Sequence, residues 1–356
     1  MTTHADTSPS TVRPPWVVIR LRRLSFRVDR RVPLAVTLLV LVLLVLLVVS
    51  VSYGDYNISP LDVIRATVGL ETSDPNDRLV VRSIRLPRIL VSLLVGVALA
   101  VSGIIMQGVT RNDLADPGLL GVNAGAGAVV VSYLVFASEP NNAVVPWLAF
   151  AGALGVSMLS YVLAWRGGIS QLRLVLVGVG LASLGSSVIS FLLTRLQIDR
   201  AQDALIWLTG SVYGSQWGDV RQLVTWLLVL LPAVVLLARE LNALSLGDLP
   251  ATSLGMRIGL KRLLLIAASA GFAAITVTVA GTIAFVGFVA PHIARRLVGP
   301  SHEGLLITGV LVGAIIMVGA DLASRWVIAP AQLPIGVTTA LIGAPYFAYL
   351  LLRRTR

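Results

Sequence analysis

The chain has 356 residues, of which 56% are hydrophobic and only 13% are Asp, Glu, Lys or Arg. A soluble globular protein carries about 25% charged residues, so too few polar side chains remain here to cover a water-exposed surface, and an ordinary soluble domain is excluded. The formal net charge is +11 and the chain has no cysteine, which excludes disulfide bonds, thiolate metal sites and cysteine nucleophiles. The composition indicates a protein embedded in a membrane.

The N-terminal segment differs from everything that follows it. Residues 1–32 contain seven arginines and two aspartates, and we predict that they form a solvated, basic cytoplasmic tail. Residues 32–53 then lack any charge, and about 20 apolar residues suffice for a helix to cross a bilayer. We therefore predict an uncleaved first span here, which opens a transmembrane domain covering residues 33–356.

The same criterion predicts nine further spans. They lie near residues 89–108, 119–137, 146–165, 172–194, 222–238, 263–280, 281–294, 304–323 and 336–352. The stretch 281–294 is short and glycine-rich, which is typical of a broken or partly re-entrant helix, so the number of spans is nine or ten. Ten spans place the two basic termini on one side. The predicted fold class is all-α, with about ten transmembrane helices.

The distribution of basic residues predicts the orientation of these spans. With the N-terminus in the cytoplasm, 19 of the 28 basic residues lie inside, as the positive-inside rule requires. The net charge then divides into +12 inside and −1 outside, so both termini are expected in the cytoplasm and no nucleic-acid partner is expected. The spans near 89–108 and 263–280 have a similar layout and begin on opposite faces, which is compatible with an inverted repeat.

The sequence offers no reaction centre. It contains no G-x-x-x-x-G-K-[ST] phosphate-binding loop, and its only lysine is Lys261. The three histidines are scattered and no pair has the spacing of metal ligands on a helix. We expect no catalytic residue, no metal and no cofactor, and hence no enzyme activity in this chain.

Asp321 is the main ionisable residue within a predicted span, and Arg325 follows it four positions later. An ion pair at the membrane edge is favoured over a proton relay, so neutralising Asp321 is expected to have little effect. If the chain transports a solute, its energy is expected to come from another polypeptide.

Two polar segments are candidates for contacts with partners. Arg85 and Arg88 lie at the outer start of the second span, where positive charge opposes the helix dipole. This placement indicates that they contact a partner, which is either a protein with surface carboxylates or the lipid headgroups. On the inner side, residues 241–262 are expected to form short amphipathic helices broken at Gly247 and Gly255. These helices would contact either a cytoplasmic partner or the membrane surface.

Six blocks of sequence, in order, resemble the FecCD family of ABC-transporter permeases, which import iron–siderophore complexes, haem and cobalamin. The blocks are RLPR at 85–88, SGIIMQGVTRNDLADPGLLGVNAGAG at 102–127, WLTGS at 207–211, SLGDLPATSLG at 245–255, GTIAFVGFVAPHIAR at 281–295 and QLPIGVTTALIGAPYFAYLL at 332–351. The resemblance runs from about residue 35 to the end. One departure is Asp113, where the family commonly has proline; the basic tail lies outside the resemblance.

The resemblance implies the permease subunit of a binding-protein-dependent ABC importer in the bacterial plasma membrane. Ferric siderophores are the expected cargo, with haem or cobalamin as alternatives in the same architecture, and a secondary transporter as the more distant alternative. The implied partners are ATP-binding subunits that hydrolyse ATP, a second permease chain that is either identical or related to this one, an extracytoplasmic solute-binding protein, and the lipid bilayer.

The resemblance also implies three sets of site residues. The binding protein is expected to dock on Arg85, Arg88 and Arg325. The ATP-binding subunit is expected to couple through residues 241–257, in particular Leu246, Gly247, Asp248, Ala251, Leu254 and Gly255. The substrate pathway is expected along the fifth and tenth helices and at Gln107, Trp207, Gly210 and Ser211.

Overall fold

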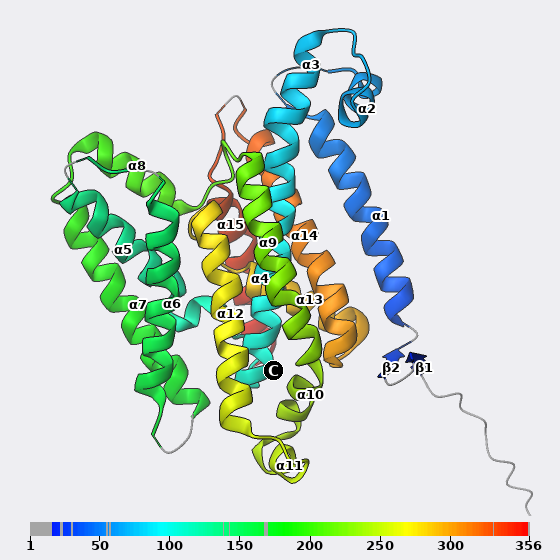
Figure 1. The fold of residues 1–356 in the computed structure, drawn as a ribbon, viewed down its shortest axis with the longest axis vertical. Coiled ribbons are helices and arrows are strands. Elements are labelled where there is room, and N and C mark those ends of the chain that lie inside the picture. The colour runs from blue at the N-terminus through cyan, green and yellow to red at the C-terminus, as the bar shows by residue number, and fades with distance from the viewer. Residues whose placement is uncertain are drawn as a thin grey trace, which may run out of the picture.

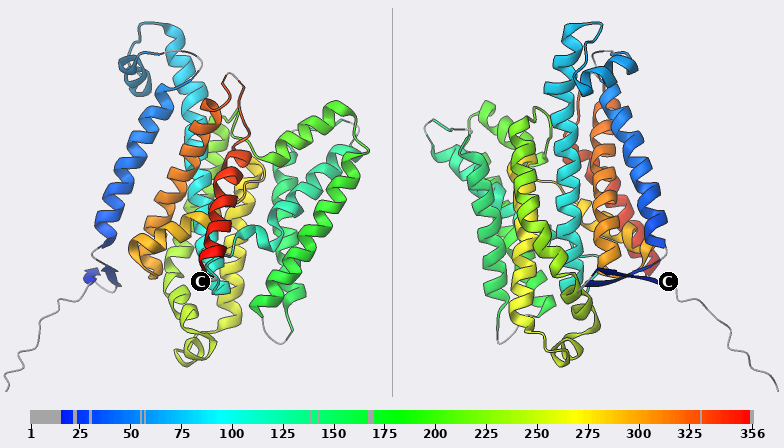
Figure 2. Two further views of the ribbon diagram at one scale, coloured as in Figure 1. Left: turned by 180° about the vertical axis from the view of Figure 1, so that it is seen from behind. Right: turned by 45° about the vertical axis from the view of Figure 1, so that its right-hand side comes forward.

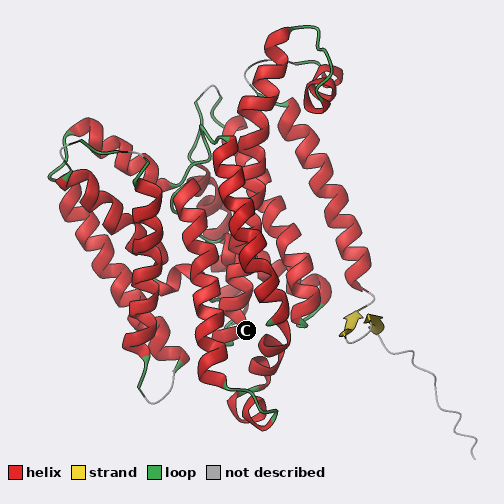
Figure 3. Ribbon diagram, viewed as in Figure 1, coloured by secondary structure: helices red, strands yellow, loops and turns green. Residues whose placement is uncertain are grey.

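The computed structural model describes residues 16–21, 24–29, 31–54, 56, 58–137, 139–141, 143–166, 170–329 and 331–354. Helices dominate this part of the chain, and its two strands form one hairpin (Figures 1 and 3). The elements are β1 (Trp16–Leu21), β2 (Leu24–Asp29), α1 (Arg31–Ser52), α2 (Pro60–Val68), α3 (Pro75–Leu79), the π-helical turn η1 (Val80–Arg85), α4 (Leu86–Thr110), the 3₁₀ turn η2 (Pro117–Leu120), α5 (Val122–Phe136), α6 (Val145–Ala164), α7 (Gln171–Leu193), α8 (Ile198–Thr209), α9 (Trp217–Leu236), α10 (Ala238–Leu246), α11 (Asp248–Ser253), α12 (Ile258–Ala280), α13 (Val286–Val298), α14 (His302–Trp326) and α15 (Ile335–Arg354).

Eight of the described helices are long and apolar enough to cross a membrane. They are α1, the continuous helix Pro75–Thr110 that contains α4, and α6, α7, α9, α12, α14 and α15. The other two predicted spans coincide with the shorter helices α5 and α13. The prediction of an all-α membrane protein is confirmed.

Helix α4 forms the centre of the bundle. It packs against α9, α12, α13 and α14 and is buried along most of its length. Helices α5, α6 and α7 form a second group on one side, and α1 packs against α14 on the other side (Figures 1 and 2). The large apolar side chains Ile104, Ile105 and Met106 of α4 are fully buried, as is Phe272 of α12. This central packing fixes the two ends of α4, where the candidate sites lie.

Small residues allow the central helices to approach closely. A Cβ atom built on Gly103 of α4 would lie 1.6 Å from the carbonyl oxygen of Gly287 in α13, and one built on Gly96 would lie 2.2 Å from the carbonyl oxygen of Gly313 in α14. Lipid tails are as apolar as leucine, so helices in a bilayer associate largely through such close van der Waals contact. The second span therefore depends on glycine at these two positions.

Replacing Gly103 with Ala is expected to destabilise the protein by about 3 kcal/mol or more, because backbone atoms of α13 must move. The measurement is the thermal unfolding midpoint of the purified protein, compared with Gly319→Ala. Gly319 lies in α14, and no atom of the described residues lies within 4 Å of a Cβ added there. Equal midpoints for the two variants would contradict the proposed contact.

The predicted interruption at residues 281–294 is confirmed. Gly281 and Phe285 have φ angles of 66° and 67°, in the left-handed region that ends a helix. Helix α13 starts only at Val286 and has 13 residues, so it is about 20 Å long, too short for a hydrocarbon core of about 30 Å. Residues 281–285 thus form an unwound segment between α12 and α13.

Two segments expected to be irregular contain regular structure. The predicted solvated tail holds the hairpin of β1 and β2. The connection at 54–88, which is predicted to lie outside, contains α2 and the start of the helix Pro75–Thr110, which projects beyond the other helices (Figure 1). Ser59 caps α2, and its hydroxyl and Ser73 hydrogen-bond Asp62, so the pKa of this carboxyl lies below its usual value. The sequence did not predict these elements because each is too short to give a clear periodic signal.

Candidate functional site

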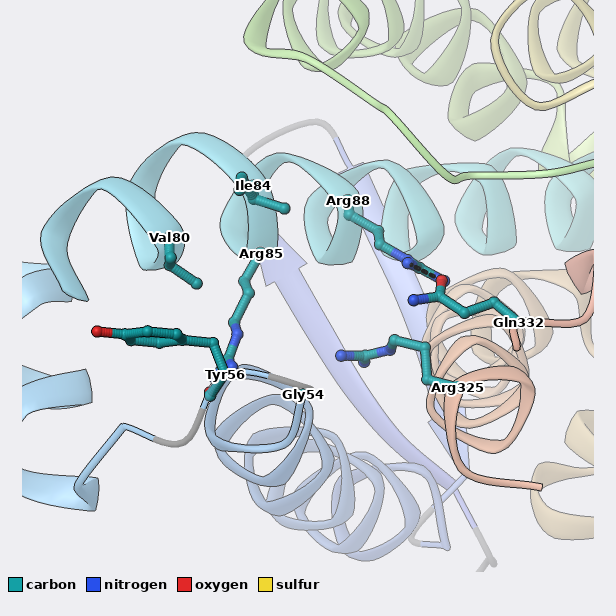
Figure 4. Close-up of a pocket in the computed structure, with 8 residues that line it drawn as sticks. All are labelled: Gly54, Tyr56, Val80, Ile84, Arg85, Arg88, Arg325 and Gln332. Carbon is teal, nitrogen blue, oxygen red and sulfur yellow. Dashed lines mark hydrogen bonds between the residues drawn. The ribbon is translucent and has the colours of Figure 1, made fainter. Parts of the chain in front are cut away.

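Three arginines meet at the end of the bundle where α1 ends and α4 begins. Arg85, Arg88 and Arg325 line a cavity of about 220 Å³, together with Gly54, Tyr56, Val80, Ile84 and Gln332 (Figure 4). Arg85 ends the π-helical turn, Arg88 lies in the first turn of α4, and Arg325 lies in the last turn of α14. We call these three residues the outer arginine cluster. The sequence predicted its members, and the fold brings them together.

A single carboxylate holds two of these arginines. Arg88 Nε lies 2.8 Å from Asp321 Oδ1, and Arg325 Nη2 lies 2.9 Å from Asp321 Oδ2. The Asp321 side chain is fully buried. Arg88 Nη1 also donates to Gln332 Oε1 at 2.7 Å, just before α15 begins. The predicted pair of Asp321 with Arg325 is confirmed, but it is one half of a buried triad that joins α4 to α14.

The other contacts of the cluster explain why cations lie at the start of α4. Arg85 donates to the carbonyl oxygens of Val51 at 2.7 Å and Ser52 at 3.1 Å, and also to that of Tyr56. Arg325 donates to the carbonyl oxygen of Ser50 at 3.1 Å. The last carbonyls of a helix lack partners and carry partial negative charge. These arginines therefore stabilise the C-terminus of α1. The expected opposition to a helix dipole does not arise, because the helix that contains α4 is continuous from Pro75 and does not start at Leu86.

This geometry corrects one aspect of the expected docking role. Arg85, Arg88 and Arg325 are 6%, 9% and 7% exposed, so they are not free side chains on an open surface. A partner could reach them only through the cavity or after their internal contacts exchange. Asp321 and Gln332 were not assigned to this site from the sequence, although Asp321 was singled out as a charge within a span.

Residues 241–257, which the resemblance predicts to be the coupling segment, lie at the opposite end of the bundle and form two short helices, as expected. Helix α10 ends at Leu246 and α11 ends at Ser253, and Gly247 and Gly255 have φ angles of 122° and 81°. Leu246, Leu249 and Leu254 are 66%, 84% and 71% exposed, whereas Ala251 is buried. The two helices therefore carry an apolar surface that no described part of the chain covers.

Asp248 fixes this segment to the bundle. Its carboxylate pairs with Arg262 of α12 at 3.0 Å and with Arg111, which follows α4. Partial burial raises the pKa of Asp248, but the charges of Arg262 and Arg111 outweigh burial and leave this pKa below its usual value. The coupling segment is thus connected directly to the central helix.

Three of the four expected pathway residues, Trp207, Gly210 and Ser211, lie in one short segment at the end of α8, and Gln107 lies apart from them. Gln107 is buried inside the bundle, where its amide donates to the carbonyl oxygen of Phe288 at 3.3 Å, so it does not line an open cavity. Gly210 and Ser211 follow α8 and bond the backbone of Gly336 and Ala280, at 3.2 and 2.8 Å. Trp207 borders a separate cavity of about 560 Å³ at the end of α8.

A further cavity, mostly apolar, lies beside the segment that follows α8. It has a volume of about 550 Å³ and is lined by the end of α8, the unwound segment and the face of α15, namely Leu208, Thr209, Thr282, Ala284, Gly336, Val337, Ala340, Leu341, Ala344 and Pro345. The sequence indicated α15 and the 207–211 segment but not Thr282. No group of three His, Asp or Glu residues in the described part of the chain could hold a metal ion.

Comparisons with known proteins agree with this architecture. The iron(3+)-hydroxamate import system permease protein FhuG of Bacillus subtilis (strain 168) is 37% identical over 327 residues, which cover 90% of this chain and 96% of that protein. The achromobactin transport system permease protein CbrC of Dickeya dadantii (strain 3937) is 39% identical over 340 residues, covering 95% and 97%.

A solved structure of a metal-chelate type ABC transporter in an inward-facing conformation is similar to this fold, with a TM-score of 0.78 and 31% identity. The match covers 90% of this chain and 99% of that chain. The FecCD transport family model matches residues 42–353, which include the outer arginine cluster, the unwound segment and the coupling segment. The chain therefore belongs to the FecCD transport family.

Proposed function

We propose that this chain is the membrane permease subunit of an ABC importer for ferric siderophores. The observation that carries the proposal is the family match over residues 42–353, combined with relatives whose names specify iron(3+)-hydroxamate import and achromobactin transport. ATP hydrolysis takes place on separate subunits, because the sequence has no phosphate-binding loop.

The ATP-binding subunit docks on α10 and α11. Leu246, Leu249 and Leu254 present apolar surface to it, and Asp248 transmits its movement to α12 and the end of α4 through Arg262 and Arg111. This assignment places α10 and α11 in the cytoplasm. The described N-terminal hairpin and the end of α15 lie at the same end of the bundle (Figures 1 and 2), which supports a multi-pass protein of the plasma membrane with both termini inside.

The solute-binding protein docks over the outer arginine cluster. Arg88 and Arg325 share the single carboxylate of Asp321, so the two positive charges are balanced by only one negative charge. A carboxylate of the partner could enter the cavity and balance the remaining charge. Charge-assisted Arg–carboxylate hydrogen bonds are strong and directional. Docking there would compete with Gln332 for Arg88 and so act on the start of α15.

Two permease chains form a dimer around the face of α15. The apolar cavity between α8, Thr282 and α15 opens on this face, and α7 is largely exposed. A second chain placed here would cover apolar surface and enclose the substrate pathway.

Reconstitution tests the proposal. In proteoliposomes that contain the chain, its ATP-binding subunit and its binding protein, we expect ATP-dependent uptake of a ferric hydroxamate, measured with radioactive iron, and no ATPase activity from this chain alone. Uptake of haem or cobalamin instead would contradict the cargo. Uptake by the isolated chain on a pH gradient would contradict the whole proposal and indicate a secondary transporter.

A further inference from the structure

Helix α14 reaches both ends of the bundle that the proposed function connects. It runs without interruption from His302 to Trp326, a length of about 38 Å at 1.5 Å per residue. Its last turns hold Asp321 and Arg325 of the buried triad, and its first turn lies beside α10. Movement of the coupling segment therefore has a second route to the outer arginine cluster, besides the ion pairs of Asp248.

One amide of α10 makes three contacts with the start of α14. Asn242 Oδ1 accepts from the backbone N–H of His302 at 3.0 Å and lies 2.8 Å from Nδ1 of the same residue. Asn242 Nδ2 donates to Glu303 Oε2 at 2.8 Å. An ionised carboxylate only accepts hydrogen bonds, which fixes the orientation of the amide. Its oxygen then faces His302, so Nδ1 of this ring carries the proton.

The backbone contact takes the place of the usual helix cap. The first N–H groups of a helix lack partners within it, and the side chain of the preceding residue commonly accepts from one of them. Ser301 precedes α14, but its hydroxyl bonds Glu303 Oε2 at 2.6 Å, and among the described residues it does not cap the helix. Asn242 belongs to another helix and supplies the acceptor. The start of α14 is thus capped from the coupling segment.

This joint is enclosed by the central helix. His302 and Leu241 are buried, and a Cβ atom added to Gly108 of α4 would lie 2.9 Å from His302 Nε2 and 2.9 Å from Leu241 Cδ2. Within the described part of the chain, His302 Nε2 has no hydrogen-bond partner, so Asn242 orients the ring through Nδ1. The amide and the ring are therefore held in one arrangement, as a joint that transmits movement requires.

We propose that Asn242 is the positioning residue through which the coupling segment moves α14, so that the state of the ATP-binding subunit reaches the outer arginine cluster. This role rests on the proposed function, in which α10 and α11 bind that subunit. Because α4 and α14 approach closely at Gly96 and Gly313, the two helices move together. The contacts that exchange are then those of the cluster with the end of α1 and with Gln332.

A distance measurement between spin labels tests this role. The natural chain has no cysteine, so Trp326→Cys at the end of α14 and Phe136→Cys at the end of α5 can be labelled specifically, and both residues are exposed. In nanodiscs with a cysteine-free ATP-binding subunit, trapping ATP with vanadate should shift this distance by about 2 Å or more. Adding Asn242→Ala should abolish the shift, although the same amount of nucleotide is trapped.

Coupling gives a second readout that a merely structural role would not move. Asn242→Ala should bind the ATP-binding subunit with unchanged affinity, because the amide faces α14. Stimulation of ATPase activity by binding protein loaded with a ferric hydroxamate should fall about tenfold, as should the iron taken up per ATP hydrolysed.

Two variants serve as controls. Asn141→Ala removes the same amide from an exposed residue whose Oδ1 accepts from the N–H of Ala143 at 2.9 Å, and it should behave as the natural chain does. His302→Asn keeps an N–H donor near the position of Nδ1 and should retain coupling, whereas His302→Leu should lose it. The pair of variants at 302 decides the question if Asn242→Ala does not fold.

Four results would overturn the proposal. The first is natural coupling and a natural distance shift in Asn242→Ala, or natural coupling in His302→Leu if the former does not fold. The second is loss of the ATP-binding subunit from Asn242→Ala, which would place the residue in the docking surface. The third is a natural chain that transports without any distance shift. A natural chain without ATP-dependent uptake would overturn the proposed function as well, so the two failures are distinguishable.

Discussion

Replacing Asp321 with Asn is expected to be among the most damaging single changes in this permease. It would leave Arg88 and Arg325 with no carboxylate between them, although both are at most 9% exposed. Removing one partner from a buried ion pair costs about 3–5 kcal/mol, because the remaining charge is left uncompensated. We expect a large fall in the thermal unfolding midpoint in nanodiscs, together with loss of transport.

The matched control is Asp199→Asn, the same chemical change at an exposed residue of α8. A double-mutant cycle with Arg88→Gln provides a second check, since the two changes should be clearly less than additive if the residues form a pair. An Asp321→Asn protein of normal stability that lost only proton-driven transport would instead support a proton relay. The sequence alone indicated little effect of this change, because it did not show that Asp321 is buried between two helices.

The second large effect is expected from the double variant Leu249→Asp, Leu254→Asp in and next to α11. Both side chains are exposed, so folding should be unaffected, whereas carboxylates would be unfavourable in an apolar interface. Loss of anchoring residues from such an interface weakens the binding free energy by about 2–4 kcal/mol. We therefore expect two measured quantities to fall at least about tenfold: the amount of ATP-binding subunit that co-purifies with the permease, and the substrate-stimulated ATPase activity.

Leu61→Asp is a suitable single-site control, since Leu61 is also exposed but lies in α2, at the opposite end of the bundle (Figure 1). Normal co-purification of the double variant would show that the ATP-binding subunit docks elsewhere. An unstable double variant would show that the two leucines support the permease itself, and the thermal unfolding midpoint separates these two outcomes.

Several elements followed from the sequence because their signals are local. A run of about 20 apolar residues must form a helix in lipid, since every backbone polar group needs a partner within the segment. Glycines at 247 and 255 ended α10 and α11 as expected, because glycine adopts the left-handed region without steric cost. The hairpin of β1 and β2 and the polar helix α2 lack such signals. They depend on pairing between strands and on capping by Ser59.

The sequence by itself determined the membrane class, the position of the eight helices long enough to cross a membrane, the family and the residue types of the outer arginine cluster. Only the tertiary structure decided what those arginines do. Arg85 reaches the end of α1, Arg88 and Arg325 share Asp321, and Gln107 is enclosed in the bundle. Residues 88 and 321 are far apart in the chain, and they meet because α4 packs on α14, whose backbones approach closely at Gly96 and Gly313. Hydropathy records which segments lie in lipid, whereas burial of a charge depends on which helices meet.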